Sequence, residues 1–169
     1  AGANASTKYL ALYGFTNDEA LKRLIDLFDD VYGRGIGAFV TSQDMGDSSM
    51  NLGILNYENG KLNATINYRH CEGYKHEDLI KRVTDTVSPY KATVLGISPL
   101  LYYPKDSVLV STLLKAYQEE TGDYKTQPQA IGGGTYAKET INTVAFGMEM
   151  PDWNSHMHSP GECVRKEDL

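Results

Sequence analysis

The dipeptide Asn59-Gly60 constrains the fold more than any other feature of this sequence, because it is the favoured two-residue turn of a β-hairpin. Apolar and polar residues alternate on both sides of it. If residue 58 lies opposite residue 61, one face gathers Gly53, Leu55, Tyr57, Leu62, Ala64 and Ile66. The other face gathers Asn56, Asn63, Thr65, Asn67 and Arg69, together with Leu52 and Ile54. We therefore predict a hairpin with one packed face and with Arg69 on the opposite side, at a strand end.

Helical patterns surround this hairpin. A short helix is expected over 4–13, and a firmer one begins at the capping box of Thr16 and Glu19 and runs to Gly33. Two more helices are expected over 76–87 and over 106–120, the latter with Asp106 as its N-cap.

Short apolar runs predict strands near 91–97, 128–132 and 143–148, whereas the glycines and polar residues of 33–50 predict a loop. Strands mixed with covering helices favour an α+β fold, a two-layer sandwich with ferredoxin-like elements.

Composition excludes several classes of function. The 169 residues include 16 basic and 22 acidic side chains, for a net charge of −6, and no basic stripe, which argues against a nucleic-acid partner. The apolar runs are far shorter than the ~20 residues of a membrane span, so no membrane partner is expected. Two cysteines and no signal peptide favour the cytoplasm. The residues at both ends resemble cut helices, so we expect a piece of a longer protein.

Three groups of residues could carry chemistry, and each has a structural alternative. Gly132-Gly133-Gly134-Thr135 could grip a carboxylate through backbone N–H groups, or could be a kink in a strand. His158 and Glu162, in a loop that also holds His156, could be a metal ligand and its partner, or surface residues. Arg69 could pair with a carboxylate, or form a surface salt bridge.

Two further acidic motifs favour a structural interpretation. His76-Glu77-Asp78 contains the H-x-D pattern of metal sites, but it opens a helix, where residues two apart do not share a face. Glu119-Glu120 lies at a helix end before Gly122 and is typical of a solvated surface.

Taken in order along the chain, these segments resemble the bacterial PepV-type dipeptidases, which belong with the carnosinases to a superfamily of two-zinc metallopeptidases. Gly2-Ala3-Asn4-Ala5 is similar to the start of a lid-domain helix, and Asn67-Tyr68-Arg69 with Glu72-Gly73 to the lid strand that carries the substrate-binding arginine. The segment 131–137 with Val144-Ala145-Phe146-Gly147 is the most specific match. His158 and Glu162 match the H-x-x-x-E of the last metal ligand.

The resemblance implies roles for these residues. Arg69 would bind the substrate carboxylate or the tetrahedral intermediate, and Gly133, Gly134 and Thr135 would hold the same end of a dipeptide. His158 would bind one zinc ion, with Glu162 nearby. A zinc-activated hydroxide would attack the peptide carbonyl. Residues 1–104 would be a lid-domain portion and residues 105–169 a segment that returns to the catalytic domain.

The same resemblance implies what the chain lacks. The family's other metal ligands, its catalytic Glu-Glu and its lid histidine have no counterpart here, so we expect the fragment to be inactive without the rest of its own chain. A homodimer is a further option. The alternative function is a non-catalytic ligand-binding or dimerisation module of ferredoxin-like layout.

Overall fold

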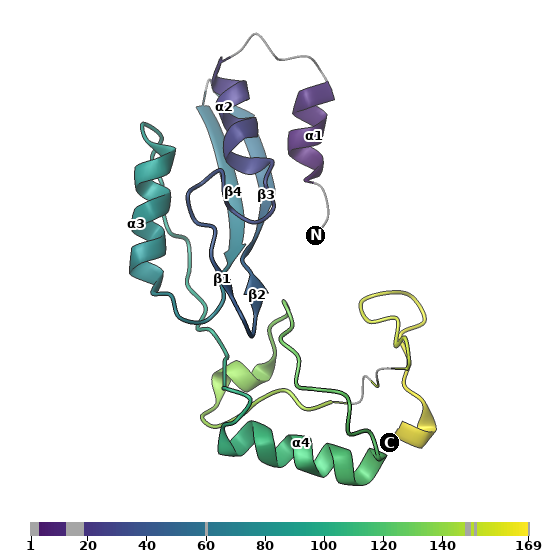
Figure 1. Cartoon of the computed structure of the whole chain (residues 1–169). Coiled ribbons are helices and arrows are strands. Elements are labelled where there is room, and N and C mark those ends of the chain that lie inside the picture. Colours follow the sequence, from purple (N-terminus) through teal and green to yellow (C-terminus); the bar gives the residue numbers. More distant parts are fainter. Residues whose placement is uncertain (1–3, 13–18, 60, 148–149, 151, 169) are drawn as a thin grey trace. The chain divides into compact units, whose positions relative to one another are not determined.

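The chain has an α+β fold, as predicted (Figure 1). The computed structural model describes residues 4–12, 19–59, 61–147, 150 and 152–168. These form two compact units, Ala1–Ser98 and Pro99–Leu169. The first unit contains α1 (Ala5–Leu12), α2 (Glu19–Phe28), β1 (Thr41–Ser42), β2 (Gly46–Asp47), β3 (Ser49–Glu58), β4 (Lys61–Arg69) and α3 (His76–Val87). The second contains α4 (Val108–Thr121) and two short 3₁₀ turns, η2 (Tyr136–Glu139) and η3 (Lys166–Asp168).

The predicted hairpin is confirmed as β3 and β4, which pair antiparallel with Glu58 opposite Lys61. A β-bulge between Leu52 and Ile54 shifts the register by one residue. Side chains alternate between the two faces along a strand. The extra residue therefore reverses which side chains of β3 before the bulge face the core, relative to the prediction. The prediction that Leu52 lies on the polar face is therefore wrong: Leu52 is buried, and it pairs with Ile66.

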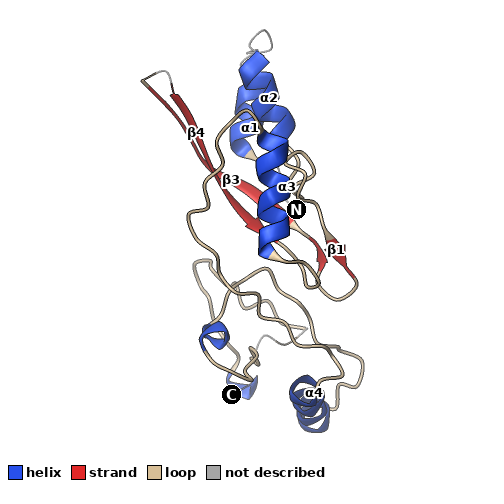
Figure 2. Ribbon diagram, turned by 90° about the vertical axis from the view of Figure 1, so that its left-hand side faces the viewer, coloured by secondary structure: helices blue, strands red, loops and turns tan. Residues whose placement is uncertain are grey.

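The helices α2 and α3 lie along one side of the hairpin (Figure 2). The main core contains buried side chains from both helices, from β3 and from the loop before it: Leu24, Leu27, Phe28, Ile36, Ala38, Met50, Leu52 and Val87. Tyr68 of β4 packs against this core, and its hydroxyl donates to the Ala38 carbonyl. The first unit thus consists of helices packed on a two-stranded sheet, with its core between the two layers.

The sequence predicts that this helix runs to Gly33, but α2 ends five residues earlier, at Phe28. The cause is Asp30, whose carboxylate accepts hydrogen bonds from the backbone N–H groups of Tyr32 (3.2 Å) and Arg34 (2.6 Å). Such side-chain bonds give the backbone an alternative to the helical pattern. Thr16 of the predicted capping box lies outside the described residues.

The glycine-rich segment 33–50 is more than a surface loop. It contains the β1–β2 pair, and it supplies Ile36, Ala38 and Val40 to the hydrophobic core, each of them 3% exposed or less. The sequence pattern conceals this contribution, because the buried residues stand among glycines and follow neither helical nor strand periodicity over the whole segment.

The strands predicted near 91–97, 128–132 and 143–148 are wrong for the residues that the structure describes, which are loop there apart from bends. Apolar residues form a strand only when a neighbouring strand accepts and donates their backbone hydrogen bonds. Here Val94, Leu95 and Ile97 are exposed by 49%, 80% and 57%.

The helix α4 is close to its predicted position, but its N-cap is Ser107, not Asp106. The Ser107 hydroxyl accepts from the Val110 N–H at 3.4 Å, and Gly122 ends the helix in the left-handed conformation with φ of 71°. Among the described residues, no helix has both the length and the apolar character that crossing a bilayer requires.

A buried polar network joins α1 to the hairpin. The Asn4 carboxamide oxygen accepts from the N–H groups of Ser6 (3.0 Å) and Thr7 (3.3 Å), which caps α1, and its amide donates to the Leu52 carbonyl (3.2 Å) beside the bulge. The buried Thr7 hydroxyl donates to the Asp29 carboxylate at 2.9 Å. Asn4 therefore serves both the helix start and a strand position where the bulge interrupts the ladder.

Replacing Asn4 with alanine is expected to lower the free energy of unfolding of the first unit by about 1–3 kcal/mol, because a helix cap and a buried hydrogen bond are lost together. Denaturant unfolding followed by circular dichroism measures this change. Asn63→Ala removes an exposed asparagine of β4 and is the control. Equal stability of the two variants would contradict the role of Asn4.

Candidate functional site

Arg69 is the last residue of β4, opposite Ser49. Its neighbour Tyr68 faces the core, so alternation along the strand places Arg69 on the face that the helices do not cover. Arg69 is exposed, and its Nε donates to the Asn67 side-chain oxygen at 3.3 Å. The hairpin thus presents a guanidinium whose planar donor pair can bind a carboxylate in a bidentate manner.

The segment Gly133-Gly134-Thr135 is a loop in the second unit. Gly133 and Gly134 have no left-handed backbone angle, and a Cβ added to either would meet its nearest atom at 3.6 Å or more. The strand-kink interpretation is wrong, because residues 128–132, directly before the triplet, do not form a strand. Thr135 caps η2, its hydroxyl accepting from the Ala137 N–H at 3.3 Å.

The ammonium group of Lys138, which the sequence does not single out, lies beside this triplet. The Nζ of Lys138 is 3.6 Å from the position that a Cβ on Gly134 would occupy. The 3₁₀ turn after Thr135 brings Lys138 back toward the triplet. An anion beside Gly134 would therefore lie near an ammonium group.

His158 and Glu162 lie in a loop whose two ends are held together. The Cys163 N–H donates to the Ser155 carbonyl at 3.0 Å, and the Glu162 N–H to the Ser159 carbonyl at 3.2 Å. His158 has a left-handed backbone, with φ of 62°, and both candidate side chains are exposed. The loop therefore carries its histidine and carboxylate at the surface, where groups from elsewhere can reach them.

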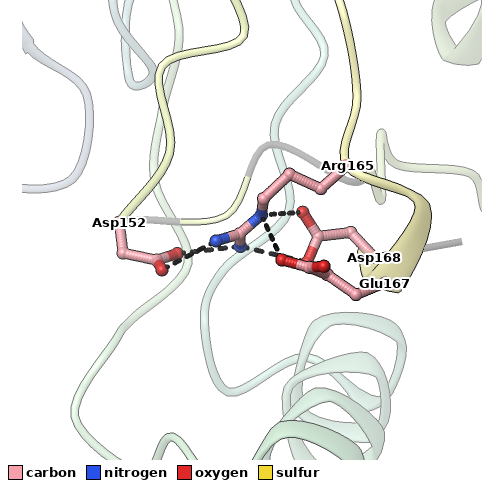
Figure 3. A network of polar contacts seen from close by, with 4 residues as sticks. All are labelled: Asp152, Arg165, Glu167 and Asp168. Atoms are coloured by element: carbon pink, nitrogen blue, oxygen red, sulfur yellow. Dashed lines mark hydrogen bonds and ion pairs between the residues drawn. The ribbon is translucent and has the colours of Figure 1, made fainter.

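Arg165 forms a network with acidic residues on both sides of this loop in the sequence, which we call the Arg165 clamp (Figure 3). Its guanidinium binds Asp152 with two hydrogen bonds, of 3.1 and 3.2 Å, and Asp168 with two more, of 2.7 and 3.0 Å. It also lies 5.3 Å from the centre of the Trp153 ring. Hydrogen bonds from Arg165 lower the pKa of Asp152, and hydrogen bonds to Asp168 and then Asp152 raise the pKa of Arg165. Because residues 153–164 lie between the partners, the network closes the loop that holds His158.

Replacing Arg165 with alanine is expected to increase the rate of proteolysis within residues 153–164 several-fold, since the clamp is lost. Limited proteolysis with mass spectrometry measures this rate, and Lys166→Ala is the control.

The Arg165 clamp should also depend on pH. Because the Asp152 pKa lies below its usual 3.8 in the folded state, the clamp is at full strength above that pH and is lost as the pH falls through the folded-state pKa. The rate of cleavage within residues 153–164 of the wild-type chain should therefore rise over that acidic range. If Arg165→Ala were cleaved at the wild-type rate at neutral pH, the clamp would be contradicted.

The candidate residues fall into two groups. Arg69 belongs to the first unit, and the triplet, His158 and Glu162 belong to the second. Within the described part of the chain, no group of three or more His, Cys, Asp or Glu side chains is arranged to hold a metal ion. A zinc site takes three or four protein ligands, so the residues present do not make up such a site by themselves.

The acidic residues of the two other motifs lie at the ends of helices, where the structural interpretation places them. His76-Glu77-Asp78 forms the first turn of α3, where the acids complement the helix dipole. Glu119 and Glu120 are exposed near the end of α4, and Glu119 lies 3.7 Å from Lys115.

Comparison with known proteins gives one consistent result. A "Putative dipeptidase" of Staphylococcus epidermidis is 34% identical over 146 residues, which is 85% of this chain and 31% of that protein. Proteins called putative dipeptidases from Staphylococcus aureus strains MW2 and USA300 are 35% and 34% identical over the same length and shares. No family model matches the chain. The chain thus spans about a third of the length of these curated relatives, and over most of its own length it is similar to one part of proteins named as dipeptidases.

Proposed function

We propose that this chain is part of a zinc-dependent dipeptidase, in which it binds the substrate carboxylate and supplies one metal ligand. The observation that carries the proposal is the identity of 34–35% over 85% of the chain to proteins named putative dipeptidases. The implied roles fall on residues of suitable chemistry: an exposed arginine, a glycine loop beside a lysine, and an exposed histidine in the same loop as an exposed carboxylate.

We propose that Arg69 and the loop of Gly133, Gly134 and Thr135 bind the substrate. Lys138, which lies beside Gly134, is added to these residues. Arg69 is the strongest candidate, because a guanidinium–carboxylate pair combines charge with two directed hydrogen bonds. At the loop, the Lys138 ammonium and the backbone N–H groups would favour the same negative end of a dipeptide. The Thr135 hydroxyl, which caps η2, retains acceptor and donor capacity for a ligand.

His158 is proposed as a zinc ligand, with Glu162 close to it. Because the described residues do not assemble a complete metal site, the remaining ligands would come from parts of a longer protein. In this proposal residues 1–104 belong to a lid domain and residues 105–169 return to a catalytic domain, in a cytoplasmic enzyme. The 169-residue chain by itself is expected to be inactive.

Sequencing the coding region on both sides of this segment tests the proposal first. We expect a histidine codon just before Ala1 and, farther upstream, an H-x-D, an Asp, a Glu-Glu and another Asp. A start codon next to Ala1, or an unrelated upstream domain, would contradict the enzyme and favour a non-catalytic binding or dimerisation module.

Metal removal from the longer protein tests the proposed zinc dependence. Dialysis against a chelator is expected to abolish dipeptide hydrolysis, and added zinc to restore it, because the nucleophile depends on the metal. His158→Ala should lower the bound zinc measured by elemental analysis, whereas His156→Ala, in the same loop, should not. Activity that persists in the chelated protein would exclude zinc dependence, and unchanged zinc content in His158→Ala would remove that residue from the site.

A further inference from the structure

Two histidines that the proposed function does not use lie against each other in the first unit. His70 directly follows β4, and His76 is the first residue of α3. Their ring centres are 4.8 Å apart, with an interplanar angle of 77°. Both side chains are half-buried, so they are held by the protein and remain accessible to a small ion. We propose that His70 and His76 together bind a divalent transition-metal ion, independently of the proposed function.

The distance between the rings suits a shared ion. An ion bound at about 2.0 Å from an imidazole nitrogen lies about 3.2 Å from the ring centre. Two imidazoles on one ion, at ligand angles of about 90–110°, therefore have centres about 4.5–5.2 Å apart. The observed 4.8 Å falls within this range.

The hydrogen bonding of His70 also suits a ligand. Its Nδ1 lies 2.7 Å from the Cys71 carbonyl oxygen. A carbonyl can only accept, so in the neutral ring Nδ1 carries the proton and Nε2 keeps its lone pair for a metal. Metal-binding histidines characteristically donate their second ring nitrogen to such an oxygen, which fixes the tautomer and the ring orientation.

The connection between the two histidines is anchored on both sides. Cys71 is 2% exposed and forms a small core with Val40 and Leu79, the latter in the first turn of α3. Glu72 accepts a hydrogen bond from the Ser42 hydroxyl at 2.6 Å. The backbone that carries the two rings is thus held by packing before any ion binds, which lowers the entropic cost of binding.

The ligand type selects the ion. Two imidazoles favour nickel, copper or zinc, whereas magnesium and calcium prefer oxygen ligands. Water molecules would complete the coordination, so the affinity should be well below that of a four-ligand structural zinc site.

Isothermal titration of the 169-residue chain with nickel chloride tests the proposal, with magnesium chloride as the comparison. We expect nickel but not magnesium to bind, and His70→Ala and His76→Ala each to weaken nickel binding at least about tenfold. His156→Ala, which removes an exposed histidine outside this pair, should leave this affinity unchanged.

The variant His76→Phe separates metal binding from ring packing, because phenylalanine keeps an aromatic edge-to-face contact but has no ligand nitrogen. We expect His76→Phe to retain the wild-type melting temperature and to lose nickel binding as His76→Ala does. Absence of nickel binding in wild type, wild-type affinity in His76→Phe, or equal loss in His156→Ala would each overturn the proposal.

Discussion

Replacing Gly35 with alanine is expected to lower the free energy of unfolding of the first unit by about 3 kcal/mol or more. A Cβ at this position would stand 2.3 Å from the Asp26 carbonyl oxygen and 2.5 Å from that of Leu27. Both oxygens belong to the backbone of α2, which cannot yield as a flexible side chain can. Relief of the clash would displace the end of the helix that places Leu27 and Phe28 in the core.

Denaturant unfolding followed by circular dichroism measures this effect, and Gly96→Ala is the matched control. Gly96 has no atom within 4 Å of an added Cβ and no left-handed backbone, so its replacement should change stability by less than about 1 kcal/mol. If Gly35→Ala were as stable as Gly96→Ala, the close approach of the loop to α2 would not exist in solution.

In the dipeptidase that we propose, replacing Arg69 with alanine is expected to reduce kcat/KM for dipeptides by about 10²–10³, the effect of removing one charge-stabilising donor. The two roles proposed for Arg69 differ in how this loss divides. If it binds the substrate carboxylate equally in ground and transition states, the loss appears in KM. If it stabilises the tetrahedral intermediate, the loss appears in kcat. Steady-state kinetics therefore measures both the importance of Arg69 and its role.

Arg82→Ala is the control for this measurement, because Arg82 also is an exposed arginine of the first unit and donates to a backbone carbonyl, that of Phe39. It should keep kcat/KM within about threefold of wild type, since the loss of one exposed hydrogen bond is small. Arg69→Lys retains the charge without the bidentate geometry and should recover only part of the activity. Wild-type kinetics in Arg69→Ala would remove this residue from the site.

The local patterns of the sequence predicted most of the regular elements of the first unit. Asn59-Gly60 defines the hairpin turn, and the apolar spacing of 76–87 defines α3 with its observed bounds. Both signals act over a few neighbouring residues, so they need no knowledge of distant parts of the chain. The strand patterns at 91–97 and 128–132 failed because pairing with another strand decides whether an apolar segment becomes a strand.

The candidate site also combines features that the sequence predicted with features that it did not. The residue types and their order along the chain, from Arg69 through Gly133-Gly134-Thr135 to His158, were enough to reveal a resemblance to dipeptidases, and relatives with that name were found. The Lys138 ammonium beside Gly134 and the Arg165 clamp on the His158 loop were not predicted. Each depends on the path of the backbone, which brings together residues several positions apart in the chain.

The sequence by itself determined the hairpin, the helices α3 and α4 and the identity of the candidate residues, because these follow from short-range periodicity and from chemical type. Only the tertiary structure decided which face of β3 is buried, since one bulged residue at Gly53 exchanges the two faces. It also decided that the loop of 33–50 contributes to the core, and that His70 and His76 meet. These outcomes depend on contacts between segments far apart in the chain, where close packing selects one arrangement.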